Sequence, residues 1–180
     1  MTYDASASSW STSLTIDNST DDVGLHSSLA IDSNDNLHVT YYDGTNGDLE
    51  YMNYYGSSWS TPQTLSNTSN VGYYSSLAID SNDNLHVAYI DTTNENLLYM
   101  AFNGQTGGWS NSIKLDESGN VGWEPSLVID SNDNLHVTYR DSSNGNLKYM
   151  TYDGSSWNSP ATLDSIDQVG YQSSLAIDSN

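Results

Sequence analysis

The sequence predicts an all-β fold of the β-propeller type, built from four-stranded antiparallel blades. First, a stretch at residues 27–39 returns almost letter for letter at 75–87 and 126–137, and begins again at 173. Second, one leucine of this stretch recurs in steps of 48, 50 and 48 residues. Third, each repeat holds four short runs with strand alternation, separated by turn residues, and no helical period. A β-sandwich has no reason to repeat this faithfully.

The first complete repeat shows the four expected strands in order. Strand A covers residues 28–32, and the turn Ser-Asn-Asp-Asn follows at 33–36. Strand B covers residues 37–42, where Leu37, Val39 and Tyr41 alternate with polar residues. Strand C covers residues 49–54, and strand D runs from 59 to 65, starting at a tryptophan. The later repeats follow the same plan.

These repeats predict one domain with three complete blades and a partial blade at each terminus. The expected boundaries are 1–26 for strands C and D with a linker, 27–74, 75–124 and 125–172 for the complete blades, and 173–180 for a last strand A. Residues 1–4 match 150–153, so strand B has no counterpart where the two ends would meet. Open sheet edges favour assembly, so we expect a homo-oligomer or a part of a larger propeller.

The charge balance excludes several kinds of partner. The chain carries 23 acidic against 3 basic residues, for a net charge of −20. Nucleic acids and anionic membranes need clustered Lys or Arg, so neither is expected as a partner. There is no cysteine for disulfides or thiolate metal sites, and no apolar run long enough for membrane insertion. We expect no cofactor, and an extracellular or cell-surface location.

The connections between strands predict where a ligand would bind. In a propeller the D–A and B–C connections share one face, and here they differ between repeats, whereas the A–B turn is identical in all three complete repeats. Varied aromatic and polar positions on one face suggest a recognition surface. Drift in exposed loops is an equal alternative. The candidate ligand-binding residues are Tyr73, Tyr74, Trp123, Glu124 and Tyr171 from the D–A linkers, and Asp43, Asp91, Arg140 and Asp141 from the B–C region.

Trp123 and Glu124 suggest the chemistry of that ligand. An aromatic ring beside a carboxylate suits a sugar, because the ring covers its apolar face while the carboxylate accepts from its hydroxyls. Packing of the larger ring between blades is the alternative for Trp123. No metal is expected: the turn at 32–36 resembles a calcium loop but has Leu37 and Thr40 where glycine and aspartate are needed. His38, His86 and His136 share one strand position and are expected to pack, not to bind metal.

The strand patterns SLAIDSNDNLHV and LKYMTYDGSSW resemble those of sialidase-type propellers over essentially the whole chain. Sialidases use three arginines to hold a carboxylate, and this chain has only Arg140. Some polysaccharide lyases share such propellers, and His38 with Tyr41 or Tyr42 would imitate their base and acid. The pattern LHVTYYD…LEYMNYYGSSW is similar to that of fucose-binding propeller lectins, whose arginine and glutamate positions here hold His38 and Tyr51.

Together these observations favour a non-enzymatic recognition propeller that binds carbohydrate, with no catalytic residues. Two alternatives stay open. One is a structural repeat segment of a larger surface protein without a small ligand, and the other is a glycan-cleaving lyase or hydrolase.

Overall fold

The computed structural model describes residues 3–4, 6 and 8–178, and all regular structure among them is β-strand. Three antiparallel sheets follow one another along the chain, and their neighbouring strands are consecutive in sequence except that β11 pairs with β9 beside β10. The first contains β3 (Val23–Ile31), β4 (Leu37–Asp43), β5 (Asp48–Tyr54) and β6 (Gln63–Ser66). The second contains β7 (Val71–Ile79), β8 (Leu85–Asp91), β9 (Asn96–Asn103), β10 (Gly108–Trp109) and β11 (Ile113–Asp116). The third contains β12 (Val121–Ile129), β13 (Leu135–Asp141), β14 (Asn146–Tyr152) and β15 (Ala161–Asp164).

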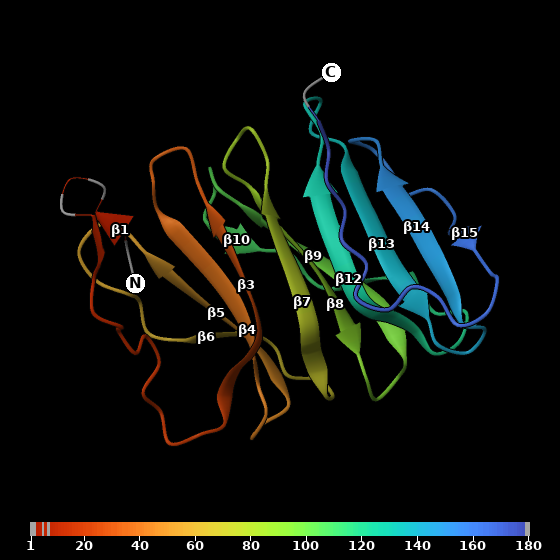
Figure 1. The fold of residues 1–180 in the computed structure, drawn as a ribbon, viewed down its shortest axis with the longest axis horizontal. Helices are drawn as coiled ribbons and strands as arrows, with labels where there is room; N and C mark the ends of the chain where they lie inside the picture. The colour runs from red at the N-terminus through yellow and green to blue at the C-terminus, as the bar shows by residue number, and fades with distance from the viewer. Residues whose placement is uncertain (1–2, 5, 7, 179–180) are drawn as a thin grey trace.

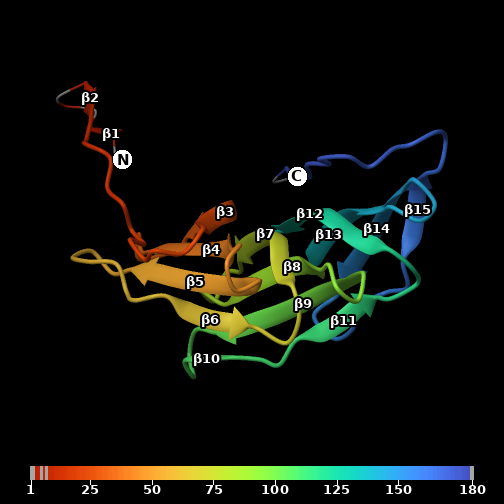
Figure 2. The ribbon, with the colours of Figure 1, turned by 90° about the horizontal axis from the view of Figure 1, so that it is seen from below.

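The three sheets are the predicted propeller blades. They stand side by side, with β3, β7 and β12 as the inner strands (Figure 1). Figure 2 shows these inner strands along one side of the array, with β6, β10 and β11 along the other. The all-β fold and the strand order A-B-C-D are therefore confirmed. No helix among the described residues is long and apolar enough to cross a membrane.

Two strand boundaries differ from the prediction. The inner strands begin at Val23, Val71 and Val121, so the end of each D–A linker belongs to strand A. Register shifts interrupt this first part of each inner strand, which breaks the alternation by which a strand is recognised in a sequence. The outer strands are shorter than predicted, and Trp59 forms only an isolated bridge to Tyr54.

The chain termini only partly follow the prediction. β1 (Tyr3–Asp4) and β2 (Ser9–Trp10) pair as a hairpin, as the C and D strands of a partial blade should. Residues 165–178 contain no strand, and residues 179–180 of the expected last strand A lie outside the described residues. Residues 1–2, which belong to the expected first strand C, also lie outside them.

Apolar side chains fill the spaces between blades. The first such cluster joins Leu49 and Tyr51 of the first blade to Leu77, Leu85 and other residues of the second. The second cluster joins the second and third blades in the same way, through buried residues of β8, β9, β12, β13 and β14. Burial in these clusters is the main favourable term for a blade that is too thin to be stable alone.

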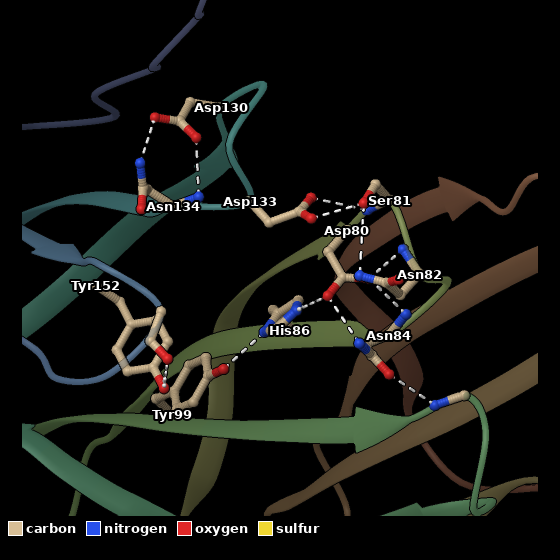
Figure 3. Close-up of polar contacts among 12 residues, drawn as sticks. Asp80, Ser81, Asn82, Asn84, His86, Tyr99, Asp130, Asp133, Asn134 and Tyr152 are labelled. Carbon is tan, nitrogen blue, oxygen red and sulfur yellow. Dashed lines mark hydrogen bonds and ion pairs between the residues drawn. The ribbon is translucent and has the colours of Figure 1, made fainter.

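The identical A–B turns are explained by hydrogen bonds within and between blades. In the second blade, Asp80 accepts hydrogen bonds from the backbone N–H groups of Asn82 and Asn84 and from the Asn84 side chain (Figure 3). The turn serines of the first two blades are bonded to the next blade: Ser81 donates its N–H and its hydroxyl to the two carboxylate oxygens of Asp133, at 2.9 and 2.6 Å. Ser33 binds Asp83 in the same way. We call this contact the turn latch.

The inner strands are also joined by serine side chains. The N–H of Leu77 donates to Ser28 Oγ at 3.0 Å, and the N–H of Leu127 donates to Ser76 Oγ at 3.0 Å. Neighbouring inner strands share no ladder of backbone hydrogen bonds. The serine hydroxyls therefore satisfy backbone donors that would otherwise lie partly buried without an acceptor.

One ion pair is buried between the second and third blades. Lys148 Nζ lies 2.6 Å from Asp116 Oδ2, and Tyr139 donates its hydroxyl to the same oxygen. Burial raises the pKa of Asp116, but the hydrogen bonds from Lys148, Tyr139 and Ser118 outweigh it, so this pKa lies below its usual value.

Replacing Ser76 tests the contact between inner strands. We expect Ser76→Ala to lower the free energy of unfolding by about 1–3 kcal/mol, because the Leu127 N–H loses its acceptor in a partly buried place. Urea denaturation measures the change. Ser57→Ala, at an exposed turn, is the control and should leave the midpoint unchanged. Equal effects of the two substitutions would contradict the role of Ser76.

Replacing Lys148 tests the buried ion pair. We expect Lys148→Met to cost about 3 kcal/mol at pH 7, because the Asp116 carboxylate stays buried without its cation. The lowered pKa of Asp116 means that this carboxylate stabilises the fold above its unfolded pKa of about 4, and that the contribution is lost as pH falls below that value. The penalty of Lys148→Met should therefore shrink at pH 3. Lys114→Met, which removes an exposed pair with Glu117, should change little at either pH.

Candidate functional site

The candidate site is formed by the first part of each inner strand, where the backbone is unusual. His26, Tyr74, Glu124 and Gln172 occupy one position of the repeat, and all four have φ between 48° and 55°. This left-handed conformation is unfavourable for a residue with a side chain. Because the same conformation recurs in every copy, the fold imposes it and leaves the side chain free to vary. Such residues are often found at binding sites.

A glycine two residues earlier makes this backbone possible. Gly72 has φ of 89°, and a Cβ there would lie 2.6 Å from Leu49 Cβ of the first blade. Gly122 has φ of 87°, and a Cβ there would lie 2.7 Å from Leu97 Cα. Only glycine fits this close approach between blades. It sets the direction in which the following residues leave the strand.

The four left-handed residues line one open pocket of about 270 Å³, which we call the axial pocket. The residues that follow them complete its wall. The lining consists of His26, Ser27, Tyr74, Ser75, Glu124, Pro125, Gln172 and Ser173. Because the lining comes from β3, β7, β12 and residues 172–173, the pocket lies where the inner strands of successive blades converge.

Aromatic rings support the pocket on one side. The ring centroid of His26 lies 4.1 Å from that of Tyr73 and 4.0 Å from that of Tyr74. Tyr73 packs in turn against Tyr42, with 5.2 Å between centroids, and Trp123 lies 6.3 Å from Tyr74. The edge-to-face contacts hold the rings in place and give the pocket a firm apolar side.

The polar side of the pocket is acidic. Glu124 accepts a hydrogen bond from the backbone N–H of Gln172. Burial lowers the pKa of His26, although the Glu124 charge opposes this, so His26 is neutral at pH 7. Burial raises the pKa of Tyr74, and Glu124 and Tyr73 add to the effect. The pocket therefore offers hydroxyl groups, a neutral imidazole and one carboxylate.

The structure brings together four of the predicted ligand-binding residues and leaves a fifth at the rim. Tyr74 and Glu124 line the axial pocket, while Tyr73 and Trp123 support it from the preceding position. Trp123 also donates its indole N–H to Asn120 Oδ1. Tyr171 is 59% exposed, and its hydroxyl accepts from Arg140 Nη2 at 2.9 Å. That these residues bind a ligand stays a prediction.

The predicted residues of the B–C region lie elsewhere and are used by the fold. Asp43, Asp91 and Asp141 are each about 95% buried at the end of a B strand. Asp91 accepts from the N–H groups of Thr93 and Asn94 through one oxygen, and from the Asn94 side chain through the other. Asp43 closes its turn in the same way, and Asp141 accepts from the N–H and the side chain of Asn144. This geometry disfavours the predicted ligand role of the three aspartates.

Arg140 is also held internally. It is 7% exposed, its Nη1 donates to Ser142, and its Nη2 donates to Gln168 and Tyr171. The guanidinium carbon lies 3.9 Å from the centre of the Tyr171 ring, a cation–π contact. Arg140 therefore anchors residues 168–171 rather than offering its charge to a ligand.

Sequence reasoning missed two members of the pocket. His26 and Gln172 occupy the repeat position of Tyr74 and Glu124, so the internal alignment held the necessary signal. His26 follows Leu25 rather than an aromatic residue, whereas Gln172 directly follows Tyr171, which the sequence analysis does name.

The histidines of strand B form a second recurring group. His86 Nδ1 lies 2.6 Å from the Tyr99 hydroxyl, and His86 Nε2 lies 3.4 Å from Asp80 Oδ2 (Figure 3). His38 bonds to Tyr51, whereas the hydroxyls of Tyr41 and Tyr42 donate to Asp17 and Asn70, so neither of these two tyrosines is the hydrogen-bond partner of His38. The turn aspartates accept N–H donors through both oxygens, which accounts for the loop geometry without a cation. The described residues contain no group of three or more potential metal ligands.

No protein-family model matches the chain, and no curated protein matches it. Solved structures do share its fold. The intramolecular trans-sialidase of Ruminococcus gnavus aligns with a TM-score of 0.55 and 15% identity, over 76% of this chain and 33% of that one. A PL25 ulvan lyase aligns with a TM-score of 0.53 and 14% identity, over 78% and 43%. The Aleuria aurantia lectin aligns with a TM-score of 0.52 and 19% identity, over 77% and 44%.

These likenesses define the class of protein: the chain is an all-β propeller similar to the propellers of sialidases, a polysaccharide lyase and a fucoside-binding lectin. At such low identity they show the fold alone. The chain spans less than half the length of these structures.

A pair of substitutions tests the left-handed backbone of the pocket. At Tyr74, both Asn and Val remove the ring, but Asn tolerates positive φ and β-branched Val does not. We expect Tyr74→Val to be less stable than Tyr74→Asn by about 1–2 kcal/mol in urea denaturation. Tyr73 lies in β7 and does not have positive φ. There, the Tyr73→Val variant should be at least as stable as Tyr73→Asn. If the Val variant were the less stable one at both positions, or at neither, the left-handed backbone at Tyr74 would not be the cause.

Proposed function

We propose that this protein is a non-enzymatic recognition propeller that binds a neutral carbohydrate in the axial pocket. The observation that carries the proposal is the convergence of His26, Tyr74, Glu124 and Gln172 on one pocket, from repeats whose A–B turns are identical. Rings of Tyr and His suit the apolar face of a sugar, and the Glu124 carboxylate suits its hydroxyl groups. Binding sites commonly combine such an apolar surface with a few fixed polar groups.

The charges of the chain favour a neutral ligand. Its three basic residues are all engaged within the protein: Lys148 binds Asp116, Lys114 binds Glu117, and Arg140 is held by Ser142, Gln168 and Tyr171. No Lys or Arg lines the axial pocket, and Glu124 and a net charge of −20 would repel a carboxylate or sulfate. A sialic acid or uronate would therefore bind poorly compared with a neutral sugar.

Two features favour recognition over cleavage. The axial pocket has one carboxylate, whereas glycoside hydrolysis usually needs two, placed on either side of the bond. In the pair of His86 and Tyr99, burial raises the pKa of the tyrosine, which makes that hydroxyl a weaker acid for catalysis. Such pairs also recur in all three complete blades, which suits a structural role. An extracellular or cell-surface location suits this function and stays a prediction.

Binding to a panel of glycans tests the proposal. We expect the protein to retain neutral glycans and not sialylated or uronate-containing ones, and Glu124→Gln to weaken binding about tenfold, a loss of about 1.4 kcal/mol. Glutamine suits the site backbone because Gln172 has the same conformation. Glu117→Gln, on the outer surface, is the matched control.

Three results would contradict the proposal. Absence of any glycan binding would favour a structural repeat segment, and equal binding by Glu124→Gln and wild type would place the ligand elsewhere. Release of reducing ends or unsaturated uronates from glycan polymers would favour the lyase or hydrolase.

A further inference from the structure

A groove borders the third blade on the side away from the second. It has a volume of about 320 Å³ and lies between the turn and strands of that blade and residues 175–178. Its lining consists of Asp130, Ser131, Asn132, His136, Tyr149, Leu175, Ile177 and Asp178. At the two contacts between blades, the next blade fills the corresponding space. Three details of those contacts indicate what would fit here.

The first detail is an extended segment, residues 173–177, that lies where an inner strand would lie but pairs with no strand of the described chain. The N–H of Leu175 donates to Ser126 Oγ at 3.0 Å, and Ser173 Oγ lies 3.0 Å from Thr138 Oγ1. β7 is held on the first blade in the same way. Each of β3, β7 and β12 pairs with a B strand, whereas residues 173–177 pair with no strand that the structure describes. Their free edge offers backbone donors and acceptors to an added strand.

The second detail is an incomplete turn latch. Ser33 binds Asp83, and Ser81 binds Asp133, each through a backbone N–H and a hydroxyl. Ser131 holds the same position in the third blade and lines the groove, yet no described residue supplies a carboxylate to it. The free donors of Ser131 therefore fit the turn aspartate of a further blade, which would bind Ser131 as Asp133 binds Ser81.

The third detail is an incomplete ring contact. Tyr51 packs against Trp109 with 5.3 Å between centroids, and Tyr99 packs against Trp157 with 5.2 Å. Tyr149 is the equivalent residue, lines the groove and makes no ring contact with a tryptophan of the described chain. Elsewhere this ring is covered by the tryptophan at the start of strand D, so one side of the groove is a surface that a further blade covers beyond its B and C strands.

We propose that this edge is an acceptor site for a B–C hairpin of the same repeat supplied by a second molecule, with a B strand of the sequence Asp-Asn-Leu-His-Val-x-Tyr. The pairing of β12 with β13 sets the register, so Leu175 would lie opposite the valine, and Ile177 opposite the leucine, of that strand. The leading aspartate would bind Ser131 and complete the turn latch.

A peptide with the sequence of residues 133–152, blocked at both ends, tests this proposal with the full chain as receptor. We expect saturable binding at one peptide per chain by calorimetry, and slower hydrogen exchange of the backbone amides of residues 174–177. Ser131→Ala in the receptor should weaken binding about tenfold because the aspartate loses one of two donors.

Two controls make the result specific. Ser57→Ala, on a distant turn, should bind the peptide as wild type does. A peptide carrying Val137→Asp should not bind, because its valine position faces the apolar core. Absence of binding at millimolar peptide, equal binding to Ser131→Ala, or protection of amides other than those of Ser131 and residues 173–177 would overturn the proposal.

Discussion

The fold depends on a small set of hydrogen bonds that fix one blade against the next. The inner strands lie side by side without a shared ladder, so Ser28 and Ser76 accept the leucine N–H groups that face them. At the end of these strands, Asp83 and Asp133 reach back to the preceding blade and bind both donors of a serine. Apolar burial supplies most of the stabilising energy, but because it is non-directional it does not fix how one blade is oriented against the next. These short polar contacts set the step from blade to blade, and they explain why the turn sequence is repeated without change.

Because these contacts fix the position of each blade relative to the next, the inner strands form a constant backbone that carries different side chains. Gly72 and Gly122 approach the preceding blade too closely for any other residue. The chain then passes through a left-handed residue whose side chain enters the axial pocket. Tyr74 and Glu124 are both unbranched at Cβ and adopt the same left-handed conformation, so they can differ without altering the frame. Variation at this position is therefore informative about a ligand, whereas variation in an exposed outer turn is not.

The period and alternation of the sequence were enough to predict the blades, their strand order and the convergence of Tyr73, Tyr74, Trp123 and Glu124. They were not enough to predict where the inner strands begin, because the register shifts after Val71 and Tyr73 break the two-residue alternation. They also did not reveal the role of Asp91. The sequence does not distinguish an aspartate that binds a ligand from one that closes a turn at the end of a strand. The turn role of Asp91 is visible only in the hydrogen bonds that it accepts from the N–H groups of Thr93 and Asn94.

One position shows how nearly identical blades keep their order. Strand C places Glu50, Leu98 and Lys148 opposite Tyr41, Tyr89 and Tyr139. Lys148 meets Asp116 of the preceding blade, whereas Glu50 lies in the field of Asp17 and has its pKa raised, by burial first. Docking the first blade where the third belongs would bury Glu50 against Asp116, two carboxylates without a cation. Because an unpaired buried charge is costly, this single position penalises an exchange of blades that the rest of the repeat would tolerate.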